Sequence, residues 1–159
     1  MNYKGLLAFV VVGLLVVGLA AWADEASLEG NLSADRTVGI GLQADFPWGG
    51  LLSARYWATP RLGGEVVVFV LGDGFDLSGT VTGRALYRAV DSDSVDFYLA
   101  LGASVPFSAY GGGATVFSGV GGIEVNFSRR FAWNVEFGLA ASTAGTVSTA
   151  FGTGLHFYF

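Results

Sequence analysis

Strict alternation between bulky apolar residues and small or polar residues is the feature that most restricts how this chain can fold. Residues 133–140 show it clearly, with Trp133, Val135, Phe137 and Leu139 on one face and Asn134, Glu136, Gly138 and Ala140 on the other. A period of two places successive side chains on opposite faces of an extended strand, whereas a helix needs a period of 3.6. Because the pattern recurs from residue 37 onwards, we predict an all-β fold.

Turn-forming residues divide the alternating region into eight predicted strands, at residues 37–46, 51–59, 64–71, 78–90, 95–105, 115–127, 131–142 and 147–159. All three prolines, Pro47, Pro60 and Pro106, fall between these strands, where a missing N–H breaks no sheet hydrogen bond. Eight antiparallel strands joined in sequence would close into an up-and-down barrel with both termini at one end. The strand at 64–71 is apolar on both faces, so its orientation stays open.

The choice of inner face separates two classes of barrel. A soluble lipocalin-like carrier turns its apolar face inward, whereas a transmembrane barrel turns it toward lipid. Charged residues make up only 13% of this chain, against roughly 25% in ordinary soluble domains. The polar face is mostly Gly, Ser, Ala and Thr, which suit a narrow interior better than a wet exterior. We therefore predict a transmembrane barrel that contacts outer-membrane lipids, with the soluble carrier as an alternative.

Aromatic residues cluster near the ends of the predicted strands, as in the two interfacial girdles of membrane barrels. At the end that would hold both termini, the expected girdle comprises Tyr56, Tyr87, Phe97, Phe127, Trp133 and Phe159. At the opposite end it comprises Phe46, Trp48, Phe75, Phe107, Tyr110 and Phe117.

The first 23 residues resemble a helical secretory signal peptide. Lys4 precedes an apolar run over residues 6–20, and Ala21-Trp22-Ala23 supplies the small-x-small cleavage pattern. The run is shorter than the roughly 20 residues of a membrane-spanning helix, although an uncleaved anchor is the alternative. We predict a signal peptide at 1–23 cleaved after Ala23, a short periplasmic segment at 24–36 and the barrel domain at 37–159.

The last strand resembles the C-terminal signal of outer-membrane barrels. Gly154, Phe157 and Phe159 match that signal, while Gly152 stands where a polar residue is usual. The resemblance implies recognition by the barrel assembly machinery and location in the outer membrane of a Gram-negative-type bacterium. Segments 53–57 and 122–139 are similar to the small eight-stranded barrels grouped with the outer membrane protein A transmembrane domain and outer membrane protein X. These families share an architecture rather than one biochemical function.

Five charged residues fall inside strands and, by the alternation, point into the lumen: Arg55, Arg84, Arg88, Glu124 and Glu136. Each is expected at a similar height, with Glu65 and His156 nearby. An eight-stranded barrel has room for little besides side chains, so these charges must pair. We predict an internal Arg/Glu network that closes the lumen, with a small gated pore as the alternative. Gly121-Gly122 would supply lumen space or a bend.

Catalytic and cofactor motifs are absent from the sequence. There is no cysteine, and His156 is followed two residues later by Tyr158 instead of the Ser that a lipid A deacylase motif would need. The net charge of −5 and the lack of a Lys/Arg cluster argue against nucleic-acid partners. We expect a monomeric, non-enzymatic barrel without metal or cofactor, with a role in envelope integrity or narrow permeability. A lipid A-modifying enzyme is a further alternative.

Overall fold

A computed structural model describes residues 36–72, 77–92, 94–109 and 111–159 of the 159-residue chain. The predicted signal peptide, its cleavage residues Ala21 and Ala23, and nearly all of the predicted periplasmic segment lie outside this part. Over the described residues, no helix is both long enough and apolar enough to span a membrane.

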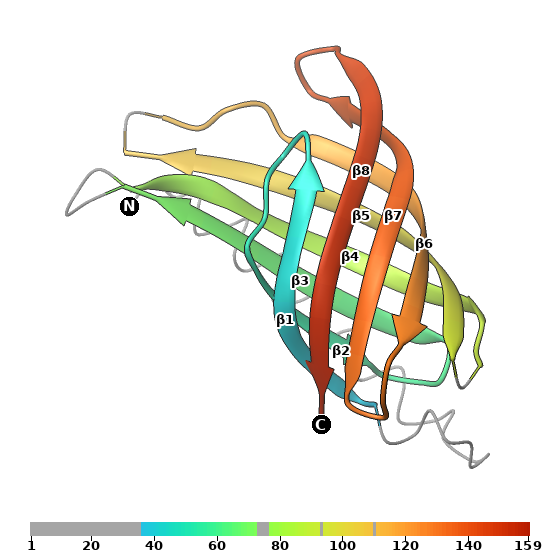
Figure 1. The fold of residues 1–159 in the computed structure, drawn as a ribbon. Helices are drawn as coiled ribbons and strands as arrows, with labels where there is room; N and C mark the ends of the chain where they lie inside the picture. The colour runs from blue at the N-terminus through green and yellow to red at the C-terminus, as the bar shows by residue number, and fades with distance from the viewer. Residues whose placement is uncertain (1–35, 73–76, 93, 110) are drawn as a thin grey trace.

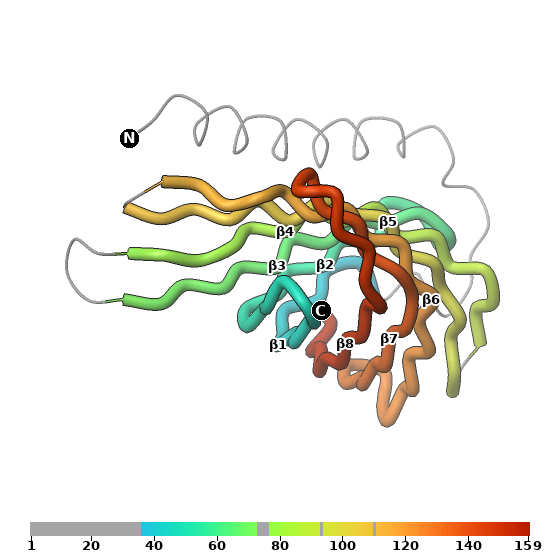
Figure 2. Tube along the Cα trace, turned by 90° about the horizontal axis from the view of Figure 1, so that it is seen from above, coloured from blue at the N-terminus to red at the C-terminus, as the bar shows by residue number. Residues whose placement is uncertain are grey.

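The described chain forms eight antiparallel strands, and each pairs with the next in sequence (Figure 1). They are β1 Val38–Phe46, β2 Leu52–Trp57, β3 Leu62–Leu71, β4 Ser78–Val90, β5 Val95–Ser108, β6 Val116–Asn126, β7 Phe131–Ser142 and β8 Val147–Tyr158. Pairing of β8 with β1 closes the barrel, in which Figure 2 shows β1 and β8 side by side. The predicted all-β, up-and-down barrel is confirmed.

The two ends of the barrel differ in which chain ends and connections they hold. The terminal end is where β1 begins and β8 ends, and the distal end holds the β1–β2, β3–β4, β5–β6 and β7–β8 connections. Strands β3, β4 and β5 run out furthest toward the distal end (Figure 1).

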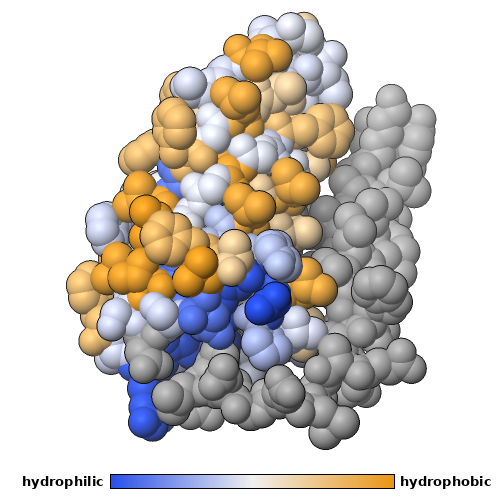
Figure 3. Space-filling model, turned by 90° about the vertical axis from the view of Figure 1, so that its right-hand side faces the viewer, coloured by the Kyte–Doolittle hydropathy of each residue, from blue (hydrophilic) through white to orange (hydrophobic). Residues whose placement is uncertain are grey.

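The bulky apolar face of the strands lies outside and the polar face lies inside. Phe137 and Leu139 are 66% and 61% exposed, whereas Asn134 and Glu136 are at most 1% exposed. Figure 3 shows hydrophobic side chains over much of the surface, with hydrophilic ones gathered at the lower end. This is the sense of the alternation expected from the sequence. It also orients β3, in which Glu65 and Val67 point inward.

Pro106 does not lie in a connection, because β5 continues to Ser108. Pairing with β6 ends at Ser104, while pairing with β4 continues through Pro106. Ala109 N donates to Leu77 O on the β4 side, so by alternation the Pro106 nitrogen faces the side where β6 is no longer paired. A proline is tolerated at this position because its missing N–H has no strand to meet.

Trp48 was expected in the distal aromatic girdle, and this prediction is wrong. Its side chain is only 7% exposed and closes the distal end of the lumen. The turn after β1 folds inward, with Gly49 at φ 76° and Thr80 Oγ1 donating to Trp48 O over 3.1 Å. Phe46 and Phe117 do face outward, while Phe75 and Tyr110 lie outside the described residues.

Candidate functional site: the charged lumen network

Arg55 is one of two arginines at the centre of the lumen near the terminal end. Its Nη1 donates to Glu124 Oε2 over 2.5 Å, and its Nη2 lies 3.3 Å from Glu65 Oε2. The guanidinium also stands 5.1 Å from the centre of the Tyr98 ring. Arg55 is only 1% exposed, so its charge is balanced by these side chains rather than by water.

Arg84 is the second central arginine. It lies on β4, two strands away from β2, which carries Arg55. Its Nε and Nη2 both donate to Glu65 Oε2, and its Nη1 donates to Glu136 Oε2 over 2.5 Å. Asp45 Oδ1 lies 3.7 Å from the same Nη1. Glu65 therefore bridges both arginines, and it is the hub of the network.

Two tyrosine hydroxyls provide further hydrogen bonds to the carboxylates. Tyr98 donates its hydroxyl to Glu136 Oε1 over 2.5 Å, and the Tyr158 hydroxyl lies 3.1 Å from Glu124 Oε1 and Oε2. Hydrogen bonds to a charged group are about twice as strong as those between neutral groups. In total, two arginines face four carboxylates, from Asp45, Glu65, Glu124 and Glu136.

Inward-facing glycines allow these side chains to meet across an intervening strand. An added Cβ at Gly41 would lie 2.9 Å from His156 Cα, and one at Gly122 would lie 2.7 Å from Tyr98 Cε1. Four bonds of the lumen span such a glycine: Arg55–Tyr158 over Gly39, Ser53–His156 over Gly41, Tyr98–Glu136 over Gly122 and Gln43–Asn134 over Gly154. Gly122 thus supplies the lumen space expected from the sequence.

A chain of hydrogen bonds fixes the tautomer of His156. Gln43 Nε2 donates to the Asp45 carboxylate, which leaves Gln43 Oε1 to accept from Asn134 Nδ2 over 3.1 Å. Asn134 Nδ2 also lies 3.3 Å from His156 Nδ1. Because an amide NH₂ only donates, Nδ1 must accept, and the neutral ring carries its proton on Nε2.

The structure brings Ser53, His156 and Glu65 into mutual contact, although they lie on three different strands. Ser53 Oγ is 2.9 Å from His156 Nε2 and 2.5 Å from Glu65 Oε1, and Nε2 is 3.1 Å from that same oxygen. A serine nucleophile needs an unprotonated imidazole nitrogen to accept its proton. Here Nε2 carries a proton and both groups donate to Glu65, so the geometry is that of a structural hydrogen-bond cluster.

The acidic side chains and His156 do not form a metal site within the described residues. No group of three or more His, Asp or Glu side chains among them is arranged to hold an ion. The carboxylates of the network are instead occupied by arginine, tyrosine, serine and glutamine donors.

Arg88 lies in a separate group, so the expectation that all five lumen charges share one height is wrong. Its Nε is 3.5 Å from Asp96 Oδ2, its Nη1 donates to Pro60 O over 3.1 Å, and its guanidinium stacks 3.9 Å above the Trp57 ring. Arg84 and Arg88 are four residues apart, which corresponds to about 13 Å along a strand. This group closes the terminal end of the lumen.

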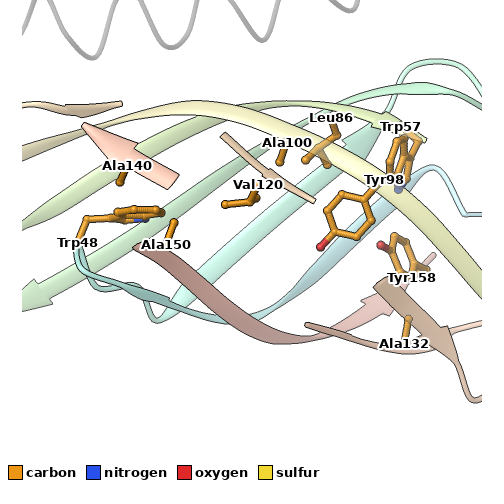
Figure 4. Close-up of a cluster of buried hydrophobic side chains, with 10 residues drawn as sticks. All are labelled: Trp48, Trp57, Leu86, Tyr98, Ala100, Val120, Ala132, Ala140, Ala150 and Tyr158. Atoms are coloured by element: carbon orange, nitrogen blue, oxygen red, sulfur yellow. The ribbon is translucent and has the colours of Figure 1, made fainter. Parts of the chain in front are cut away.

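The distal half of the lumen is lined differently, by small side chains. Thr82 and Ser104 share a hydroxyl hydrogen bond of 2.7 Å, and Ala140 and Ala150 lie beside the Trp48 ring (Figure 4). Trp57, Tyr98 and Tyr158 lie together in the other part of the same view. No charged residue points into the lumen beyond Asp45 among the described distal residues.

All five charges predicted for the lumen are placed inside the barrel by the structure. Four of them, Arg55, Arg84, Glu124 and Glu136, belong to the central network. Sequence reasoning missed the roles of Glu65 and Asp45 as partners. The three residues of the predicted assembly signal divide between the faces, with Gly154 inside and Phe157 and Phe159 outside.

Comparison with known proteins adds no relative: no protein-family model matches the chain, and no curated protein matches it. The resemblance to small outer-membrane barrels accordingly stays a prediction.

Proposed function

We propose that this protein is an outer-membrane barrel with a closed lumen, which contributes to the structure or the limited permeability of the envelope. The observation that carries the proposal is the distribution of side chains around the closed barrel. Large apolar side chains point outward from all eight strands, while eight charged side chains lie inside: Asp45, Arg55, Glu65, Arg84, Arg88, Asp96, Glu124 and Glu136.

The outer surface supports a lipid environment. Leu101, Leu139 and Phe151 are 68%, 61% and 49% exposed near the middle of their strands. Soluble monomers rarely expose contiguous apolar patches larger than a few hundred Å². Acyl chains would cover this surface without the cost of apolar hydration, and a closed barrel leaves no strand edge unpaired within the bilayer.

The interior supports a closed rather than a conducting barrel. The ion pairs of Arg55 and Arg84 cross the lumen, and the side chains of both arginines are at most 1% exposed. The Arg88–Trp57 stack and Trp48 close the two ends. An eight-stranded barrel has room for side chains and little else, so we assign the network a structural role and propose no catalytic activity.

Assembly follows from the same proposal. The chain would be exported by the signal peptide at residues 1–23 and would reach the barrel assembly machinery through Gly154, Phe157 and Phe159. The outward position of the two phenylalanines leaves both side chains available for recognition before the barrel closes.

Cell fractionation combined with gel mobility tests this function. After expression in a Gram-negative host, the protein should sediment with the outer membrane and migrate differently with and without boiling. Leu101→Lys should reduce the folded band, because a lysine facing the bilayer midplane costs about 2–4 kcal/mol. The matched control Ala144→Lys, in an exposed distal turn, should fold like the parent chain. A protein that stays in the aqueous periplasmic fraction, with both variants equally folded, would contradict the proposal.

Planar-bilayer recording tests the closed state separately. The parent protein should show no sustained conductance, whereas a stable open level in the parent protein would replace the structural role with that of a pore.

A further inference from the structure

The arginines at the surface of the described barrel, three of them exposed and one half-buried, all lie at its terminal end. Arg61 is in the β2–β3 turn, Arg129 and Arg130 are in the β6–β7 turn, and Arg36 precedes β1. We call these four residues the arginine rim. The connections at the distal end, 47–51, 72–77, 109–115 and 143–146, contain no Lys or Arg in the sequence. The basic residues of the described surface are therefore confined to one end, where the exposed Asp91 lies 3.9 Å from the buried Arg88 rather than against a rim arginine.

Hydrogen bonds from the Arg36 side chain to the backbone of the β6–β7 turn hold three of the rim arginines close together. Arg36 Nε donates to Arg129 O over 3.0 Å, and its Nη2 donates to Ser128 O over 2.7 Å. These bonds fix Arg36 beside the turn that carries Arg129 and Arg130. None of the rim arginines has a carboxylate within ion-pair distance among the described residues, in contrast to Arg55, Arg84 and Arg88.

Exposed aromatic rings lie next to the rim. Phe127 and Phe131 flank Arg129 and Arg130 with ring centroids 5.8 Å apart, and Phe157 packs edge-on against Phe159 at 5.1 Å. Aromatic belts mark the level of lipid headgroups in membrane barrels. Arginines placed just beyond such a belt would reach the layer of lipid phosphates.

We propose that the arginine rim binds the phosphate groups of anionic phospholipids in the leaflet at the terminal end. The inference rests on the proposed function, since it requires an inserted barrel. A guanidinium binds phosphate through two parallel hydrogen bonds, and each basic residue near an anionic membrane surface strengthens binding by about fivefold. The distal end, without basic residues in its connections, would show no such preference.

Trp133 provides a built-in reporter. It faces outward on β7, three residues from Arg130, whereas Trp48 and Trp57 are buried inside the barrel. The exported protein would be reconstituted in phosphatidylcholine vesicles that contain either brominated phosphatidylglycerol or brominated phosphatidylcholine. Quenching of Trp133 then measures the relative affinity of the two lipids next to the rim. The Trp133→Phe variant supplies the background.

The parent protein should favour phosphatidylglycerol by at least about fivefold, and replacement of all four rim arginines with glutamine should abolish the preference. The Arg→Lys version of the same four positions should retain it, because the charge is kept. Excess inorganic phosphate at matched ionic strength should leave it unchanged, and its loss would point to a free-phosphate site and overturn the proposal.

Equal quenching by both lipids in the parent protein would also overturn the proposal. One physical route to that result is neutralisation of the rim by Asp24, Glu25, Glu29 and Asp35, which precede Arg36 in the sequence. In that case the insertion itself would still stand, since both brominated lipids quench Trp133. Absence of quenching by either lipid would instead contradict the proposed membrane location.

Discussion

The two halves of the lumen are filled by different kinds of side chain. The terminal half is filled by long charged side chains, with Glu65 bridging Arg55 and Arg84. The distal half is filled by small side chains such as Ala140 and Ala150, with Trp48 folded over its opening. We infer that the stability of the terminal half depends on buried ion pairs. The stability of the distal half depends instead on the packing of small side chains and on single hydrogen bonds between hydroxyl groups.

The largest difference between the halves should come from removing the hub of the network. Glu65→Ala leaves two buried arginines without a shared partner, and breaking a buried ion pair in this way costs about 3–5 kcal/mol. Ser104→Ala in the distal half removes one neutral hydrogen bond and should cost about 1 kcal/mol. Urea unfolding of the refolded barrels in lipid vesicles measures both. Equal costs for the two variants would remove the distinction.

A pair of adjacent glycines tests whether the network depends on open space. Gly122→Ala places a Cβ against the Tyr98 ring and should cost about 1–3 kcal/mol, as overpacking does. In Gly121→Ala the new Cβ faces outward and meets Leu99 Cδ2 at 3.9 Å, an ordinary contact, so stability should change little. The free energies of unfolding of the two variants give the comparison. A neutral Gly122→Ala would show that Tyr98 and Glu136 do not need this gap.

The distal hydroxyl pair should give a smaller coupling. A double-mutant cycle with Thr82→Val and Ser104→Ala should yield a coupling of about 0.5–1.5 kcal/mol, typical of neutral hydrogen bonds. The equivalent cycle with Tyr98→Phe and Glu136→Gln should give about 1.5–3 kcal/mol, because the acceptor is charged. A reversed order of the two couplings would contradict the account.

The smallest effect is the position of one proton on His156, which is read from NMR chemical shifts of the unmodified protein and involves no difference in stability. The nitrogen chemical shifts of His156 at neutral pH should be those of an imidazole protonated on Nε2 and unprotonated on Nδ1, as the Asn134 contact requires. Assignment of the proton to Nδ1 would break the hydrogen-bond chain from Asp45 to Glu65. It would also restore Nε2 as a possible base for Ser53.

Alternation was sufficient to predict the strands but not the contacts between them. All eight strands were predicted within a few residues, because outward-facing and lumen-facing positions alternate along most of them and turn residues separate them. The terminus of β5 was misplaced at Pro106, since the sequence does not show that β6 stops pairing first. Likewise, the inward fold of the turn at Trp48 has no sequence pattern of its own.

The lumen network was predicted as a set of residues rather than as a set of partners. Glu65 was not identified as the hub because β3 is apolar on both faces and its alternation gives no orientation. The four bonds across glycines depend on which residues face each other in three neighbouring strands. That register is set by the whole barrel, so Gly41 and Gly122 could be recognised as space for Ser53–His156 and Tyr98–Glu136 only from the structure.

The central claim is that the apolar face meets lipid, and spin-label accessibility tests it most directly. The chain has no cysteine, so single labels at Leu101→Cys, Leu139→Cys and Ala144→Cys are unambiguous. In vesicles, the first two labels should collide more with oxygen than with a water-soluble nickel chelate, and the label in the distal turn should show the reverse. Higher accessibility to the nickel chelate at Leu101 and Leu139 would contradict the account.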